Sequence, residues 1–135
     1  MRSILVLVAG AMVAGCAAQP VAPVRTAKAQ ERLDQLIAGK VAGAPLSCLA
    51  RQNATDMVVI DDDTIAFRRG RRQTYVNHLQ GGCSQLGNGT ALVTRSSGGV
   101  GLCRGEIAQV ADLSSGTTVG SCVFGDFIPY TRPRG

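Results

Sequence analysis

The chain has 135 residues, which is enough for one domain and too few for two ordinary ones. Hydrophobic residues make up 45% of it, but aromatic residues make up only 4% and tryptophan is absent. A core so poor in aromatic side chains indicates reinforcement by cross-links. The 14 basic and 9 acidic residues give a formal net charge of +5, which favours an anionic partner.

The N-terminus has the pattern of an export signal. Met1-Arg2-Ser3 is a short positively charged start, and Ile4 to Val13 is an uninterrupted apolar run. This run is too short for a membrane-spanning helix, which needs about 20 residues. Val13-Ala14-Gly15-Cys16 then resembles the lipobox of bacterial lipoproteins. In those proteins a diacylglyceryl group is attached to the cysteine thiol, the preceding peptide bond is cut and the new amine is acylated.

Residues 1–15 are therefore predicted to be a lipoprotein signal peptide, and Cys16 the lipidated N-terminus. A secretory signal cut after Ala18 is the alternative, and it leaves the position of Cys16 unexplained. Two or more acyl chains on Cys16 anchor a protein stably to a membrane. Ala17, rather than aspartate, follows the cysteine, which by resemblance to enterobacterial sorting predicts the periplasmic face of the outer membrane. Loss of Arg2 leaves 13 of the 14 basic residues against 9 acidic ones, a net charge of +4.

The cysteines support this interpretation, because one of five is used by the anchor. The remaining four form an even set, Cys48, Cys83, Cys103 and Cys122, which is expected to make two disulfides in an oxidising periplasm. We expect Cys83–Cys103 and Cys48–Cys122, because the strand that carries Cys103 is predicted to lie beside the loop that holds Cys83. The other two pairings stay open. Wide spacing and the absence of a C-x-x-C pair argue against a metal site.

The mature chain divides into a tether and one domain. Residues 16–26 contain Pro20 and Pro23 and are predicted to be a flexible tether, and residues 27–135 a single small disulfide-bonded β domain. From Ala27 to Ala38, the apolar residues fall on one helical face, which predicts a short amphipathic helix that covers the end of a β-structure. Gly39 is placed to end this helix.

The rest of the chain predicts strands. Alternating and β-branched runs separated by turn residues predict six of them, over residues 57–60, 64–69, 73–79, 91–95, 102–110 and 117–124. Ile65 and Phe67 are expected to share one face of their strand, as are Tyr75, Asn77 and Leu79. The prediction is a mainly β fold, a small antiparallel six-stranded meander that is barrel-like, with one short N-terminal helix.

The sequence offers few groups for catalysis. His78 is the only histidine, and it lies in a predicted strand, so it favours a packed or surface residue over a Ser-His-Asp or Cys-His site. Asp61-Asp62-Asp63 predicts an acidic turn, because the surrounding residues do not form a calcium loop. Gly98-Gly99-Val100-Gly101 lacks the lysine and helix of a phosphate-binding loop. No catalytic residue, metal or cofactor is predicted.

A group of arginines has the clearest functional potential. Arg68, Arg69, Arg71 and Arg72 flank Gly70 at a predicted hairpin tip. Guanidinium groups bind phosphate through paired hydrogen bonds, so this tip is a candidate contact for anionic lipid, lipopolysaccharide or an envelope protein. A solvated turn is the alternative. Nucleic acid is not expected, because the predicted location is outside the cytoplasm.

Several short motifs between Cys48 and Pro129 resemble a family of small proteobacterial exported proteins of unknown function. They are Asp62-Asp63-Thr64-Ile65, Tyr75-Val76-Asn77-His78-Leu79, Leu102-Cys103-Arg104-Gly105-Glu106 and the stretch from Cys122 to Pro129. This resemblance implies a compact disulfide-bonded β domain and no known activity.

Two classes of function stay open. The first is a non-enzymatic envelope lipoprotein that acts as an interaction or structural module. The second is an inhibitor of a lytic enzyme, because periplasmic lysozyme inhibitors are also small, disulfide-bonded, lipid-anchored β-barrels with a Ser/Gly loop. Ser96-Ser97-Gly98-Gly99 is similar to that loop. The net positive charge argues against the second class, because lysozymes are usually basic and would be repelled.

Overall fold

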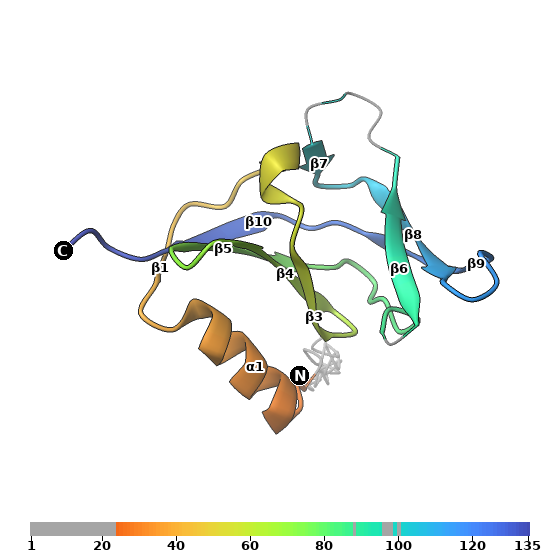
Figure 1. Ribbon diagram of the computed structural model, residues 1–135, viewed down its shortest axis with the longest axis horizontal. Helices are drawn as coiled ribbons and strands as arrows, with labels where there is room; N and C mark the ends of the chain where they lie inside the picture. Colours follow the sequence, from red (N-terminus) through yellow and green to blue (C-terminus); the bar gives the residue numbers. More distant parts are fainter. Residues whose placement is uncertain (1–23, 88, 96–98, 100) are drawn as a thin grey trace, which may run out of the picture.

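A five-stranded antiparallel sheet forms the centre of the computed structural model, which describes residues 24–87, 89–95, 99 and 101–135. Within the described residues, one α-helix lies against one face of this sheet, and two smaller sheets lie on the other side (Figure 1). The predicted signal peptide, Cys16 and most of the predicted tether fall outside the described residues.

The elements follow one another with short connections. In chain order they are α1 (Ala27–Ile37), β1 (Val41–Ala42), β2 (Cys48–Ala50), the 3-10 helix η1 (Arg51–Asn53), β3 (Met57–Asp61), β4 (Thr64–Arg69), β5 (Gln73–His78), β6 (Thr90–Thr94), β7 (Gly101–Cys103), β8 (Ile107–Asp112), β9 (Thr118–Val123) and β10 (Phe127–Thr131). The prediction of a mainly β, antiparallel fold with one helix near the N-terminus is confirmed.

The strands form three separate sheets, with the orders β1-β10-β5-β4-β3, β2-β7 and β6-β8-β9. The predicted six-stranded meander and its barrel-like closure are therefore wrong. The predicted strand 102–110 is interrupted at Gly105, which has a φ of 83°, so its two halves join different sheets. In addition, β10 returns to the central sheet and pairs with β5 in full register from Phe127 to Thr131.

The helix α1 forms at the predicted place and ends one residue earlier than expected. Thr26 caps it, because the Thr26 hydroxyl accepts a hydrogen bond from the Ala29 amide at 3.2 Å. Gly39 follows its end with a φ of 67°, as a helix C-terminus favours. Leu33 packs, with Ala29, against the face of the five-stranded sheet. The helix thus covers a face of the sheet and not the end of a β-structure.

The main core lies on the opposite face of the central sheet. Ile65, Phe67 and Tyr75 point from β4 and β5 into it and meet residues of the smaller sheets. The ring of Phe127 lies 6.1 Å from that of Phe67 and 5.8 Å from that of Phe124, measured between ring centres. The few aromatic residues are thus concentrated at one point. Residues 64–67 of β4 are fully buried on both faces, since α1 covers the second face.

All four cysteines of the domain are bridged, as predicted, but the expected pairing is wrong. The bonds are Cys48–Cys103 and Cys83–Cys122. Cys48 and Cys103 are directly opposite each other in the β2–β7 ladder, with their Cα atoms 4.0 Å apart. The prediction failed because it placed Cys103 in one long strand, residues 102–110, whereas β7 and β8 belong to different sheets.

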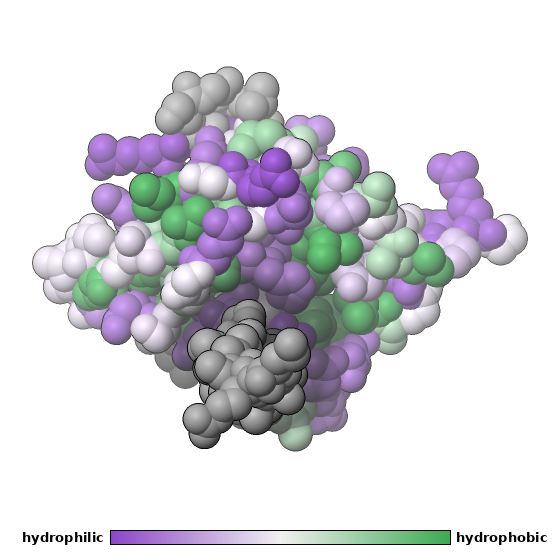
Figure 2. Space-filling view, turned by 180° about the vertical axis from the view of Figure 1, so that it is seen from behind, coloured by the Kyte–Doolittle hydropathy of each residue, from purple (hydrophilic) through white to green (hydrophobic). Residues whose placement is uncertain are grey.

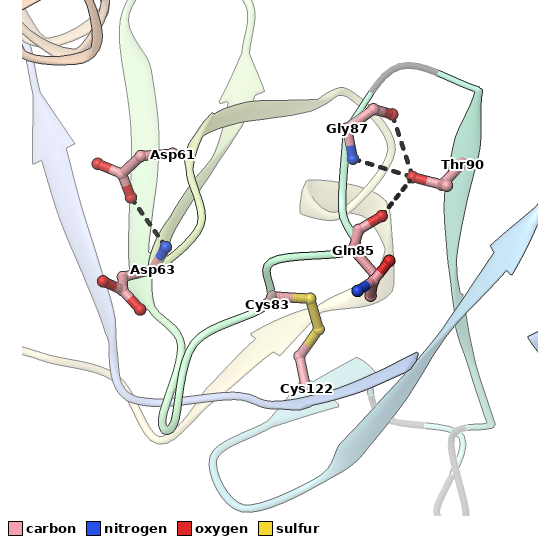
Figure 3. The surroundings of a disulfide bond; sticks show 7 residues. All are labelled: Asp61, Asp63, Cys83, Gln85, Gly87, Thr90 and Cys122. Atoms are coloured by element: carbon pink, nitrogen blue, oxygen red, sulfur yellow. Dashed lines mark hydrogen bonds between the residues drawn. A yellow bond between two sulfur atoms is a disulfide. The ribbon is translucent and has the colours of Figure 1, made fainter. Parts of the chain in front are cut away.

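The second disulfide fastens the loop between β5 and β6 to β9 (Figure 3). The Cys83 amide also donates to the carbonyl of Asp62 at 2.6 Å. Further along the loop, the Thr90 hydroxyl donates to the carbonyls of Gln85 and Gly87, at 3.2 and 3.1 Å. The disulfide and these hydrogen bonds therefore hold the loop in place between the β3–β4 hairpin and the three-stranded sheet.

A buried asparagine joins β5 to the segment that precedes β10. The Asn77 amide nitrogen donates to the carbonyls of Gly125 at 2.8 Å and Asp126 at 3.3 Å. Its side-chain oxygen accepts from the Gly125 amide at 3.1 Å. A Cβ atom on Gly125 would overlap the carbonyl oxygen of His78, so glycine allows this close approach. The corner between β9 and β10 is thus held in place by one side chain.

Candidate functional site

The four arginines predicted to contact an anion do lie at one hairpin tip. Gly70, with a φ of 60°, turns the chain between β4 and β5, and all four arginines are exposed. Arg68 is engaged, since its guanidinium donates to both carboxylate oxygens of Asp56, at 2.9 and 3.2 Å. Arg69, Arg71 and Arg72 have no side-chain hydrogen bond or ion pair within the described part of the chain. Three of the predicted contacts are therefore free to bind an anion.

Two further cations lie at the same end of the sheet. The Arg132 amide, just after β10, donates to the carbonyl of Arg72 at 2.8 Å, which brings a fifth arginine beside the tip. Lys40, from the segment after α1, donates to the hydroxyl of Thr74 at 2.9 Å and also to the carbonyl of Leu36. We call the six residues Lys40, Arg68, Arg69, Arg71, Arg72 and Arg132 the basic end.

The electrostatics of the basic end follow from this crowding. Partial burial lowers the pKa of Lys40 below its usual value, and the positive charges of Arg132 and Arg68 lower it further. Asp56 is the carboxylate paired with this group, through Arg68. In Figure 2, the hydrophilic C-terminal arm projects from the same end of the molecule, at the right of the view. The basic end is thus a region of positive potential, which favours an anion.

The opposite end of the sheet has a different composition. Arg25, just before α1, donates from Nε to Asp61 at 2.6 Å and from Nη2 to the hydroxyl of Thr64 at 2.6 Å. The Thr64 hydroxyl also lies 3.3 Å from Nδ1 of His78. These groups line a concavity of about 1010 Å³ together with Asp62 and Asp63. The network fastens the start of α1 to the β3–β4 hairpin.

His78 has the environment of a structural histidine. It is exposed at the end of β5, yet partial desolvation lowers its pKa, as does the charge of Arg25, and together these outweigh the carboxylates of Asp61 and Asp63. Its neighbour Thr64 is fully buried and already accepts from Arg25, so this hydroxyl cannot reach a substrate. The hydroxyl in contact with His78 is therefore part of the Arg25 network.

The three consecutive aspartates form the predicted turn. The Asp61 carboxylate accepts from the Asp63 amide at 2.9 Å, the local bond with which aspartate stabilises a turn (Figure 3). Burial would raise the pKa of Asp61, but hydrogen bonds from Arg25 and from the Asp63 amide, and the charge of Arg25, lower it. The described residues contain no cluster of three or more potential ligands that could hold a metal ion.

Taken together, the fold and the site define a small, disulfide-bonded, mainly β domain with a basic end and an arginine-clamped acidic hairpin opposite. The chain belongs to a family of unknown function (DUF6491), whose model matches residues 1–120. A search of curated proteins and a search of solved structures each gave no match. Within the described ranges, no helix has the length and apolarity needed to cross a membrane.

Two residues of the basic end were missed by sequence reasoning. Tertiary contacts bring Lys40 and Arg132 to the tip. Arg132, just after β10, donates to Arg72, and Lys40, which follows α1, donates to Thr74. A signal for Arg132 does exist, because the apolar run from Phe127 to Tyr130 resembles a strand interrupted by Pro129. Of the loop considered for lysozyme inhibition, Ser96, Ser97 and Gly98 lie outside the described residues.

Proposed function

We propose that this protein is a non-enzymatic bacterial envelope lipoprotein, anchored to the outer membrane through Cys16, that holds an anionic surface against its basic end. The observation that carries the proposal is the group of three exposed arginines at the β4–β5 tip, Arg69, Arg71 and Arg72, which have no ion pair with the described residues. Guanidinium groups bind phosphate oxygens in pairs, and each basic residue near an anionic membrane contributes about 1 kcal/mol. The partner class is therefore a phosphate-bearing lipid or lipopolysaccharide.

The start of the described chain and the basic end lie at opposite ends of the same strand. The described chain starts beside Thr64, at the beginning of β4, and the tip follows Arg69, at its end (Figure 1). Five residue steps at about 3.4 Å each separate these ends by roughly 17 Å. The stretch from Cys16 to Val24 spans at most about 28 Å when fully extended. A tether of this length allows the basic end to contact the same membrane as the proposed anchor, with β4 parallel to the membrane surface.

Vesicle binding tests the contact. The full chain carrying Cys16→Ser should sediment with vesicles of zwitterionic lipid plus anionic lipid and not with zwitterionic vesicles alone. Replacing Arg69, Arg71 and Arg72 together by Gln removes about 3 kcal/mol and should weaken binding by about 100-fold. Salt should also weaken it, because screening acts beyond about 8 Å at 0.15 M.

A matched control removes the same charge elsewhere. Lys28, Arg32 and Arg95 are exposed and lie outside the basic end, so their joint replacement by Gln should leave most of the binding intact. Equal losses in the two triple variants would contradict a specific basic end. For the anchor, mass spectrometry of the membrane-extracted protein should find an acylated Cys16 at the N-terminus, and an unmodified N-terminus at Gln19 would contradict it.

A further inference from the structure

A pocket of about 400 Å³ lies at the open side of the main core, beside the point where Met57 of β3 pairs with Phe67 of β4. Its floor is apolar and consists of Met57 and Phe67 from the central sheet, Leu92 from β6, Leu102 from β7 and Ala54 after η1. Phe67 and Leu102 are buried, whereas Ala54, Met57 and Leu92 are only half-buried. The volume falls in the range of small-molecule sites, about 300–1,000 Å³.

The walls of this pocket are held by covalent and polar links. The Cys48–Cys103 disulfide joins β2 to β7 just before η1 begins. At the other end of η1, the Asn53 amide donates to the hydroxyl of Tyr75 on β5, at 3.2 Å. The 3-10 helix is therefore fixed to both sides of the core. A pocket that is formed before its ligand arrives costs less ordering on binding.

One charged group borders the apolar floor. Arg51, the first residue of η1, lines the pocket and is exposed. Its guanidinium has no ion pair or hydrogen bond to the described residues, which distinguishes it from Arg25, Arg68 and Arg104. An unpaired guanidinium beside a half-open apolar pocket matches a ligand that has an apolar body and an anionic head.

We propose that this pocket binds a single aliphatic carboxylate, with the chain on Met57, Phe67 and Leu92 and the carboxylate paired with Arg51. A carboxylate offers two acceptor oxygens to the fork of one guanidinium. The acyl groups of a lipid anchor are esters and amides without a free carboxylate, so the charge of Arg51 favours a free fatty acid over the protein's own anchor. The proposed site shares no residue with the basic end, and it stands whether or not that end binds membranes.

Titration of decanoate into the full chain carrying Cys16→Ser tests the proposal. Isothermal titration calorimetry should show saturable binding of one decanoate per chain, below the concentration at which decanoate aggregates. Each methylene that enters the pocket should tighten binding about fourfold, so octanoate should bind about 15-fold more weakly than decanoate. Decylammonium, with the same chain and the opposite charge, should not bind.

Three variants separate the pocket from the general positive charge of the protein. Arg51→Gln should weaken decanoate binding by at least tenfold, because a hydrogen bond to a charged group is lost. Leu92→Phe, which fills the pocket, should weaken it as much and leave the charge unchanged. Arg71→Gln removes another exposed arginine that has no ion pair or hydrogen bond with the described residues, this one from the hairpin tip, and should have no effect.

Backbone amide NMR locates the ligand and checks that each variant is folded. Shifts on decanoate addition should centre on Ala54, Leu92 and Leu102. Shifts centred on Arg69 and Arg72 would overturn the proposal and assign the carboxylate to the basic end. The absence of saturable binding, equal binding of decylammonium, or equal losses in Arg51→Gln and Arg71→Gln would overturn it as well.

Discussion

Replacement of Asn77 by Ala tests whether one buried side chain holds the corner between β9 and β10. The substitution removes three hydrogen bonds, to Gly125 and Asp126, each with a net value of about 1 kcal/mol. It also leaves the Gly125 amide and carbonyl without their partner in a buried place. We therefore expect a loss of about 3 kcal/mol in the free energy of unfolding, and a fall of roughly 12 °C in Tm for a domain of this size.

Urea unfolding of the full chain carrying Cys16→Ser, with its disulfides intact, measures this loss. Asn53→Ala is the matched control, because the Asn53 amide donates one hydrogen bond, to Tyr75, and its loss should cost about 1 kcal/mol. Asn77→Asp keeps the acceptor for the Gly125 amide but loses both donated bonds. If Asn77→Ala costs no more than Asn53→Ala, the corner is held by other contacts and the reasoning is refuted.

Further predictions concern cross-links and titration. Replacing Cys48 and Cys103 by Ser opens a link across 55 residues and should cost about 4 kcal/mol in urea unfolding, and a cost below about 1 kcal/mol would contradict the loop-entropy argument. In NMR titration, His78 should have a pKa below 6.5. Protonation of His78 should therefore destabilise the fold as the pH falls below 6.5. Arg25→Gln should raise the pKa of His78. Hydrogen bonds from the hydroxyl of Ser114, the amide and hydroxyl of Ser115 and the Ser114 amide lower the pKa of Asp112 to about 2. The stabilising contribution of Asp112 should therefore be present above pH 3.8 and disappear as the pH falls towards 2. A measured pKa near 3.8 would contradict these hydrogen bonds.

The elements that depend on local sequence were predictable. The helix over 27–37 follows from the spacing of its apolar residues and the glycine after it, and the β3–β4 and β4–β5 hairpins follow from Asp61-Asp62-Asp63 and Gly70. Long-range pairing was not predictable in the same way. β10 was missed because Pro129 lies in it, and proline usually marks an edge or a break in a strand. The disulfide pairing was also predicted wrongly because it depends on long-range strand pairing: β7 pairs with β2 and belongs to a different sheet from β8.

The candidate sites show the same division. The arginine tip is a local feature, so four of the six residues of the basic end could be named from the sequence. Lys40 and Arg132 join it only through contacts between distant parts of the chain, with Thr74 and Arg72. Arg51 has no distinguishing sequence context, because its place beside Phe67 and Leu92 depends on how η1 lies against the core.

The position of β10 determines the order in which this molecule can fold. All five residues of β10 pair with β5, from Gln73 to Asn77, and Val41 pairs with Thr131. A nascent chain, which emerges from its N-terminus, lacks one neighbour of β5 until residues 127–131 are free. Pairings between such distant segments form slowly, because the entropy of closing a long loop is lost before the contacts form. The central sheet is therefore completed only after residues 127–131 have been synthesised.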